Sequence, residues 1–272
     1  MNKIIVLFLL ISIISCKKET LNNIPSYITI ESITIDDNST LNNITDAWVY
    51  IDDDLQGVYE LPANFPVLAE GEHKLRIKAG IKDNGIAATR VSYPFYSSYI
   101  IENHVFNPEL TISISPEVSY LENVNFFIED FEGAGIDLEA TSISNTSIIE
   151  FDNGINKYGG GVLIDSLITF EITTDELRNL PQAGAPVYLE LDYKCNTPFL
   201  VGVYINFPQS AVLQKDLLWI TPKEDWNKIY VTLTSTISEA VGADFFKIFF
   251  GMKRDFTLDT NTIYFDNIKV VY

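Results

Sequence analysis

The sequence predicts an all-β fold made of two β-sandwich domains that follow an export signal. Three observations support this prediction. Runs of four to eight residues alternate between apolar and polar side chains and are separated by turn-forming residues. The chain is rich in residues that suit pleated, half-buried surfaces, including 17 Phe and 14 Tyr. No long run with the 3.6-residue period of an amphipathic helix interrupts the pattern.

The first 15 residues have the features of a secretory signal peptide. Met1-Asn2-Lys3 provides a basic start, and residues 4–14 contain a single polar side chain, that of Ser12. The alternative for such an apolar stretch is a transmembrane helix, which needs roughly 20 residues. This stretch has about half that length, so we expect residues 1–15 to be removed on export.

The residues around the expected cleavage point resemble a known lipidation signal. Ile13-Ile14-Ser15-Cys16 resembles the lipobox of bacterial lipoproteins, and the two lysines that follow resemble those of Bacteroidota lipoproteins. The resemblance implies that Cys16 carries the lipid, with palmitate among its acyl chains. It also implies that residues 16–26 form a tether. Each buried methylene contributes about 0.8 kcal/mol, so two or three acyl chains hold a protein permanently. We therefore expect a lipid-anchored protein of the outer membrane.

Composition narrows the possible functions. Against 18 Lys and Arg stand 37 Asp and Glu, and removal of residues 1–15 takes away one Lys, so the net charge moves from −19 to −20. Such a surface repels nucleic acid. His73 and His104 are too few for a zinc site. With Cys16 lipidated, Cys195 has no disulfide partner, and its alternating surroundings predict a small core residue.

Residues 27–118 are predicted to form the first sandwich. The segment from Val49 to Ile77 contains aspartates at 52–54, then Gly57 and Pro62, then a strand that starts near His73, and it resembles PEGA-type or related immunoglobulin-like domains. The resemblance implies a spacer or display module at a cell envelope, with His73 in a structural role. The predicted strands include 27–35, 47–51, 74–78 and 110–114, and the predicted turns are 36–38, 52–54, 70–72 and 83–85.

Residues 122–272 are predicted to form the second sandwich, after a boundary near Ser115-Pro116-Glu117. The opening Asp130-Phe131-Glu132 and the closing Phe265-Asp266-Asn267-Ile268 resemble the paired first and last strands of jelly-roll carbohydrate-binding modules and galactose-binding-like domains. Gly159-Gly160-Gly161 resembles the early glycine-led strand of those folds. One short helix is predicted from Thr173, because Thr173 and Glu176 have capping-box spacing and Pro181 would end it.

Calcium is the metal that the sequence favours most. Calcium prefers several hard oxygen ligands, such as carboxylates and backbone carbonyls. The jelly-roll resemblance implies a structural Ca²⁺ between the first and last strands, with Asp130, Glu132 and Asp266 as ligands. The alternative is that these acids cap strand ends.

Exposed aromatic side chains are the features that point to a ligand. Trp219 is the tryptophan that strand packing explains least, and the segment from Tyr93 to Tyr99 is an aromatic cluster whose Pro94 indicates a loop. Sugar rings stack on such side chains, and protein partners also bury them. Tyr93, Phe95, Tyr96 and Trp219 are therefore predicted ligand-binding residues. For the 93–99 cluster, packing between the domains, a protein partner and a glycan remain open.

Motifs for catalysis are missing from the sequence. It contains no Gly-x-Ser-x-Gly elbow, no His-Glu-x-x-His and no phosphate-binding loop. We predict a non-enzymatic envelope lipoprotein whose distal jelly roll contacts a glycan or a partner protein. The alternative is a structural subunit of an outer-membrane protein complex that binds no glycan. A glycoside hydrolase ranks third, since two carboxylates at the correct separation would suffice.

Overall fold

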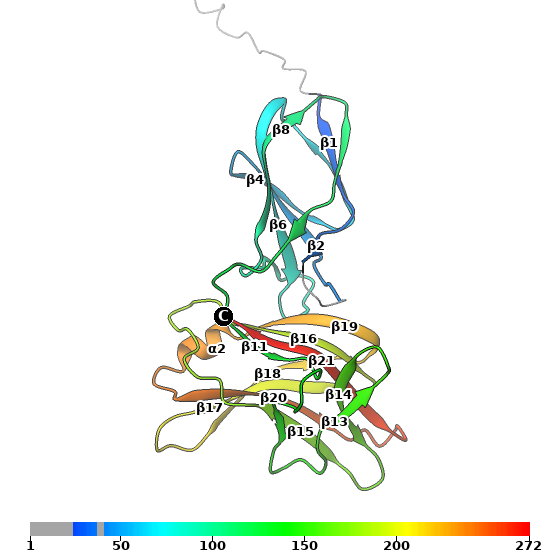
Figure 1. The fold of residues 1–272 in the computed structure, drawn as a ribbon, viewed down its shortest axis with the longest axis vertical. Coiled ribbons are helices and arrows are strands. Elements are labelled where there is room, and N and C mark those ends of the chain that lie inside the picture. Colours follow the sequence, from blue (N-terminus) through cyan, green and yellow to red (C-terminus); the bar gives the residue numbers. More distant parts are fainter. Residues whose placement is uncertain (1–23, 37–40) are drawn as a thin grey trace, which may run out of the picture.

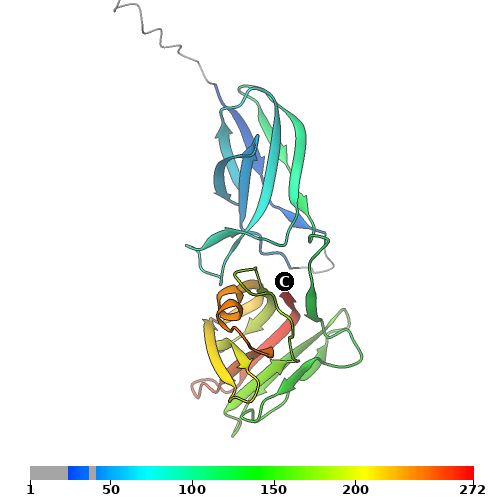
Figure 2. The same ribbon diagram turned by 90° about the vertical axis from the view of Figure 1, so that its left-hand side faces the viewer.

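A computed structural model describes residues 24–36 and 41–272, so the predicted signal peptide and Cys16 lie outside the described residues. The chain folds into two β-sandwiches in series, one formed by strands between residues 26 and 118 and the other by strands between 126 and 271 (Figures 1 and 2). The all-β prediction is therefore confirmed. In the described part of the chain, no helix has the length and apolarity to cross a membrane.

The N-terminal sandwich packs a five-stranded sheet against a three-stranded one. The larger sheet has the order β4-β3-β6-β7, with β8 also paired to β6, and the smaller has the order β5-β1-β9. A separate ribbon joins β10 to β2. The strands are β1 (Ser26–Ile30), β2 (Thr34–Ile35), β3 (Asp46–Ile51), β4 (Asp54–Glu60), β5 (Ala63–Val67), β6 (Gly71–Lys82), β7 (Arg90–Ser92), β8 (Ser98–Phe106), β9 (Thr111–Ile114) and β10 (Glu117–Val118).

The C-terminal sandwich is a jelly roll of two antiparallel sheets. A six-stranded sheet has the order β13-β14-β21-β16-β19, with β11 also paired to β21, and a five-stranded sheet has the order β12-β15-β20-β17-β18. The strands are β11 (Phe126–Glu129), β12 (Leu138–Ala140), β13 (Ile149–Asp152), β14 (Lys157–Leu163), β15 (Thr169–Thr174), β16 (Tyr188–Cys195), β17 (Phe199–Asn206), β18 (Leu213–Ile220), β19 (Lys223–Thr232), β20 (Phe245–Lys253) and β21 (Asn261–Val271).

The predicted pairing of the first and last strands of this jelly roll is confirmed. β11 runs antiparallel to β21, with Phe126 opposite Val271 and Glu129 opposite Ile268. The glycine-led segment forms β14, which pairs with the other end of the same edge of β21. Cys195 lies at the end of β16 and is buried in the core between the two sheets, as predicted.

Two local predictions were wrong. The predicted strand 27–35 is broken into β1 and β2. The helix predicted from Thr173 does not form, because Thr173 and Thr174 end β15 and Leu177 makes a bridge to Phe246 of β20. Burial of Leu177 in the core therefore outweighs the local capping signal. The helix described is α2 (Thr234–Glu239), which follows β19.

The N-terminal sandwich stands on the outer face of the six-stranded sheet. Figure 1 shows β16, β19 and β21 beneath it, whereas the five-stranded sheet lies on the far side of the jelly roll. The outer face of the five-stranded sheet is thus directed away from the N-terminal sandwich.

Candidate functional site

The outer face of the five-stranded sheet carries an open groove, which we call the outer groove. Its cavity volume is about 580 Å³. Strand alternation supplies its floor: Phe170 and Ile172 of β15 point into the core, which directs Glu171 and Thr173 outward. The groove is lined by Glu139, Ala140, Thr141, Ser142, Ile143, Glu171, Thr173, Glu176, Tyr204, Asn206, Val212, Phe245 and Lys247.

An aromatic pair forms the centre of this face. The ring of Tyr204 on β17 lies over that of Phe249 on β20, with 4.7 Å between the ring centroids. Gly202 makes the arrangement possible, because a Cβ there would lie 2.3 Å from the Phe249 ring. Phe249 is fully covered, whereas Tyr204 is half-buried and lines the groove.

Glu171 fixes the position of Tyr204. The Tyr204 hydroxyl and the Thr141 hydroxyl each donate a hydrogen bond of 2.8 Å to Glu171 Oε1. Burial, and next the hydrogen bond to Glu171, raise the pKa of the Tyr204 phenol. The hydrogen bond to Glu171 holds the Tyr204 ring in the position in which it lines the groove.

Charged side chains form the walls of the outer groove. Lys247 of β20 pairs with Glu139 of β12. On the other side, Arg178 lies 4.8 Å from the centre of the Phe245 ring and bridges Glu176 and Asp244. The groove thus combines half-exposed aromatic rings with carboxylate, amide, hydroxyl and ammonium groups, which suits a ligand with both apolar faces and hydroxyl groups.

The prediction that Tyr93, Phe95 and Tyr96 form an exposed aromatic surface was wrong. Their exposed fractions are 2%, 6% and 7%. Aromatic and apolar side chains of the jelly roll cover them, so the first of the three alternatives, packing between the domains, describes them. The Tyr93 ring lies 5.2 Å from that of Tyr188 and 5.0 Å from that of Tyr230, both in the jelly roll.

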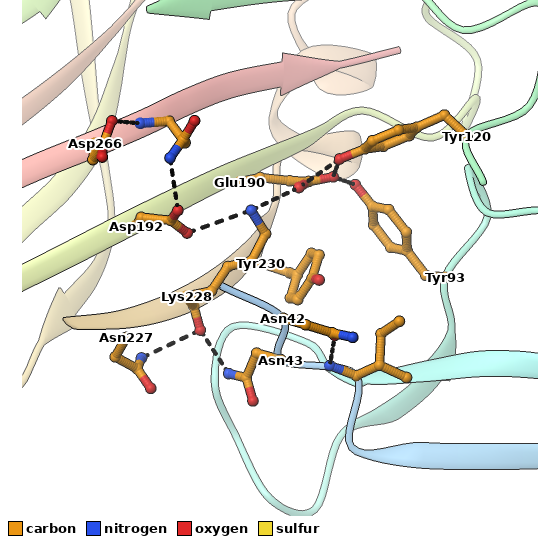
Figure 3. Close-up of polar contacts among 12 residues, drawn as sticks. Asn42, Asn43, Tyr93, Tyr120, Glu190, Asp192, Asn227, Lys228, Tyr230 and Asp266 are labelled. Atoms are coloured by element: carbon orange, nitrogen blue, oxygen red, sulfur yellow. Dashed lines mark hydrogen bonds and ion pairs between the residues drawn. The ribbon is translucent and has the colours of Figure 1, made fainter. Parts of the chain in front are cut away.

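A buried polar network completes this junction (Figure 3). Tyr93 and Tyr120 donate hydrogen bonds of 2.7 and 2.9 Å to Glu190 Oε1. Lys228 Nζ lies 3.2 Å from Glu190 Oε2 and 3.4 Å from Asp192 Oδ1. Burial would lower the pKa of Lys228, but these carboxylates raise it above its usual value. Lys228 therefore remains charged inside the junction.

Trp219 lies on the surface, as the sequence predicted. It belongs to the edge strand β18, and 56% of its surface is exposed. It lines a second cavity, between the two sandwiches, and not the outer groove. Its role in ligand binding stays a prediction.

The three predicted calcium ligands make separate contacts. Asp130 accepts a hydrogen bond from the Glu132 backbone, Glu132 accepts one from the Lys157 backbone, and Asp266 accepts one from the Asn156 side chain. Within residues 24–36 and 41–272, no group of three or more His, Cys, Asp or Glu is arranged to hold a metal ion. The strand-end alternative is compatible with these contacts, and a Ca²⁺ held by Asp130, Glu132 and Asp266 stays a prediction.

The outer groove was not predicted from the sequence. Alternation within 199–206 places Tyr204 and Asn206 opposite the apolar residues of the same strand, which marks them as outward-facing. Only the strand order shows that Glu139, Glu171, Tyr204 and Lys247 share one face, because β12, β15, β20 and β17 are far apart in the chain.

Comparisons with known proteins give only distant similarity. No family model and no curated protein matches the chain. The solved structures include the CBM22-2 xylan-binding domain of Paenibacillus barcinonensis Xyn10C, at 14% identity and a TM-score of 0.39 over 53% of this chain and 97% of that one. They also include a family 29 carbohydrate-binding module from Piromyces equi, at 10% identity and a TM-score of 0.36 over 55% of this chain and 91% of that one. Identities and TM-scores this low do not show that two proteins bind the same ligand.

Proposed function

We propose that this chain is a non-enzymatic envelope lipoprotein whose jelly roll binds a glycan chain in the outer groove. The single observation that supports this function is the combination of Tyr204 and Phe245 with hydrogen-bonding side chains on one open face. Aromatic rings bind the apolar faces of sugars, and the neighbouring polar groups bind hydroxyls. The five-stranded sheet that carries the groove lies on the side of the jelly roll away from the N-terminal sandwich, so an anchored molecule would present the groove outward (Figure 1).

Binding can be tested by affinity electrophoresis of the purified chain, without its signal, in gels that contain soluble neutral polysaccharides. We expect retardation in at least one gel, and we expect Tyr204→Ala to weaken binding by about fivefold, because an aromatic contact contributes about 1 kcal/mol. Phe245→Ala, on the neighbouring strand β20, provides a second variant in the groove.

The matched control is Tyr264→Ala, which removes a half-buried tyrosine from the outer face of the other sheet. Retardation that Tyr264→Ala reduces as much as Tyr204→Ala would contradict the assignment of the groove. Release of oligosaccharide products by the wild type would contradict the non-enzymatic part. If the chain instead recovers a membrane protein complex from detergent and no glycan retards it, the assembly alternative is correct.

The anchor and the metal need separate experiments. Cys16→Ser should move the protein from the membrane fraction to the soluble fraction, because the acyl chains supply the attachment. If a structural Ca²⁺ is held by Asp130, Glu132 and Asp266, a chelator should lower the melting temperature, and an unchanged melting temperature would count against that site.

A further inference from the structure

A second cavity lies at the junction of the two sandwiches, and we call it the junction pocket. Its volume is about 440 Å³. The N-terminal sandwich contributes one wall from Asn43 and from the turn after β6, and the edge strands β18 and β19 contribute the rest. It is lined by Asn43, Lys82, Asn84, Gly85, Ile86, Tyr193, Leu218, Trp219, Ile220, Thr221, Lys223, Asn227, Lys228 and Ile229.

Hydrogen bonds between the domains hold both parts of the N-terminal wall in place. Asn43 Nδ2 donates to the Lys228 carbonyl at 2.6 Å. The Asn84 backbone N–H donates to the Tyr230 carbonyl at 2.9 Å, and Asn84 Oδ1 accepts from the Thr232 N–H at 3.1 Å. The pocket is thus formed before any ligand arrives, which lowers the entropic cost of binding. Preformed pockets between domains are common ligand sites.

The charge of this pocket is opposite to that of the whole chain. The chain carries a net charge of −19, yet the ionisable groups that line the pocket, apart from Tyr193, are Lys82, Lys223 and Lys228. Lys228 is neutralised by Glu190 and Asp192, and Lys82 pairs with Glu60 at 3.5 Å. Lys223 is exposed and makes no ion pair with any described residue. A cation is therefore available at the mouth of the pocket.

The remaining lining is that of a site for a sugar ring. Leu218 and the small exposed parts of Tyr193 and Ile229 give apolar surface. The amides of Asn43, Asn84 and Asn227 stand among them, each with one group bonded to the backbone of β19 and the other left for a ligand. Trp219 adds a largely exposed indole. An indole, amide groups and an unpaired ammonium together match an apolar ring face, hydroxyl groups and a carboxylate.

We propose that the junction pocket binds an acidic saccharide, one that carries uronic acid residues, as a second site distinct from the outer groove. Lys223 binds the carboxylate and Trp219 stacks on the ring. The ligand contacts both sandwiches, so its affinity depends on their remaining docked.

The test uses isothermal titration of the purified chain with oligogalacturonate and with its fully methyl-esterified form. The two probes share every ring and differ in charge. We expect the acid to bind at least about tenfold more tightly than the ester, because a hydrogen bond to a charged group contributes more than one to a neutral group. Trp219→Ala and Lys223→Gln should each weaken binding of the acid by about tenfold.

Controls separate this site from the outer groove and from charge alone. Lys253→Gln removes an exposed lysine of β20 and should leave binding unchanged. Loss of binding in Tyr204→Ala but not in Trp219→Ala would assign the acid to the outer groove and overturn the proposal. Equal binding of polyglutamate, equal binding of acid and ester, or no binding of the acid at millimolar concentration would each overturn it as well.

Discussion

At the scale of single residues, Asp266 shows how position changes acid chemistry. Its carboxylate lies on β21, where it is buried and accepts hydrogen bonds from the Asn267 backbone and the Asn156 side chain. Burial raises the pKa of Asp266 to about 6, and the neighbouring charge of Asp192 acts in the same direction. The folded state therefore binds a proton that the unfolded chain, with a carboxyl pKa of 3.8, does not bind at pH 5.

This difference predicts a dependence of stability on pH. The contribution of Asp266 is fully present below pH 4, declines as pH rises through about 6, and is lost at pH 7. Relative to Asp266→Asn, the wild type should gain about 1–2 kcal/mol of unfolding free energy between pH 7 and pH 4. Urea titrations of both proteins at several pH values measure this gain. A constant difference between the two proteins across that range would contradict the prediction.

Lys228 is a residue whose loss we expect to be costly. Its side chain is 3% exposed, and its ammonium pairs with two buried carboxylates. Lys228→Met should therefore lower the unfolding free energy by about 3–5 kcal/mol, because the carboxylates remain buried without a cation. The matched control is Lys215→Met, which breaks an exposed pair with Glu239 and should change stability by less than about 1 kcal/mol. Similar losses in both variants would refute the role given to Lys228.

At the scale of secondary-structure elements, β14 depends on close approach of its backbone to aromatic rings. A Cβ on Gly161 would lie 2.5 Å from the ring of Phe170, which is fully buried between the sheets. Gly161→Ala should cost about 1–3 kcal/mol through overpacking. Gly135→Ala is the control, since a Cβ there meets no atom within 4 Å. Thermal melts of the two variants distinguish the predicted cost from a general effect of replacing glycine.

The alternation of apolar and polar residues predicted most strands, because each strand of a sandwich directs successive side chains to the core and to the surface. The runs that became β3, β9 and β16 could be recognised in this way without knowledge of their partners. The segment after Thr173 could not, because its backbone pairs with Phe246 of β20, far along the chain. The outer groove was hidden for the same reason: Glu171 and Tyr204 meet only after β20 has inserted between β15 and β17.

At the scale of the whole molecule, the aromatic segment 93–99 shows that the pattern of residues in a sequence does not predict a contact between domains. Tyr93, Phe95 and Tyr96 have the composition of a contact surface. They do form a contact surface, but the surface that they contact belongs to the same chain. The sequence separated the two sandwiches near residue 116 without indicating that Glu190 and Tyr230 would bury the tyrosines. A contact between domains has no periodic signal, because it depends on which sheet face receives the other domain.

The junction predicts that the two sandwiches unfold together. Tyr93 packs against Tyr188 and Tyr230, and its hydroxyl donates to Glu190, so separation of the domains would expose rings and leave buried ionised groups unpaired. An interface that buries aromatic rings and a polar network of both domains couples domains that would otherwise move independently. Scanning calorimetry of the wild type should therefore show one transition with equal calorimetric and van't Hoff enthalpies.

Tyr93→Ala should divide that transition into two. Loss of the ring removes contacts worth about 3–5 kcal/mol, and this loss falls on the junction because Tyr93 contacts jelly-roll residues as well as its own sandwich. Tyr27→Ala, at a partly exposed tyrosine of β1, should keep a single transition. The junction pocket gives an independent check: because Asn43 and Asn84 form its wall only in the docked state, Tyr93→Ala should also weaken the acidic saccharide. Two transitions in the wild type would show that the network orders the junction without coupling the domains.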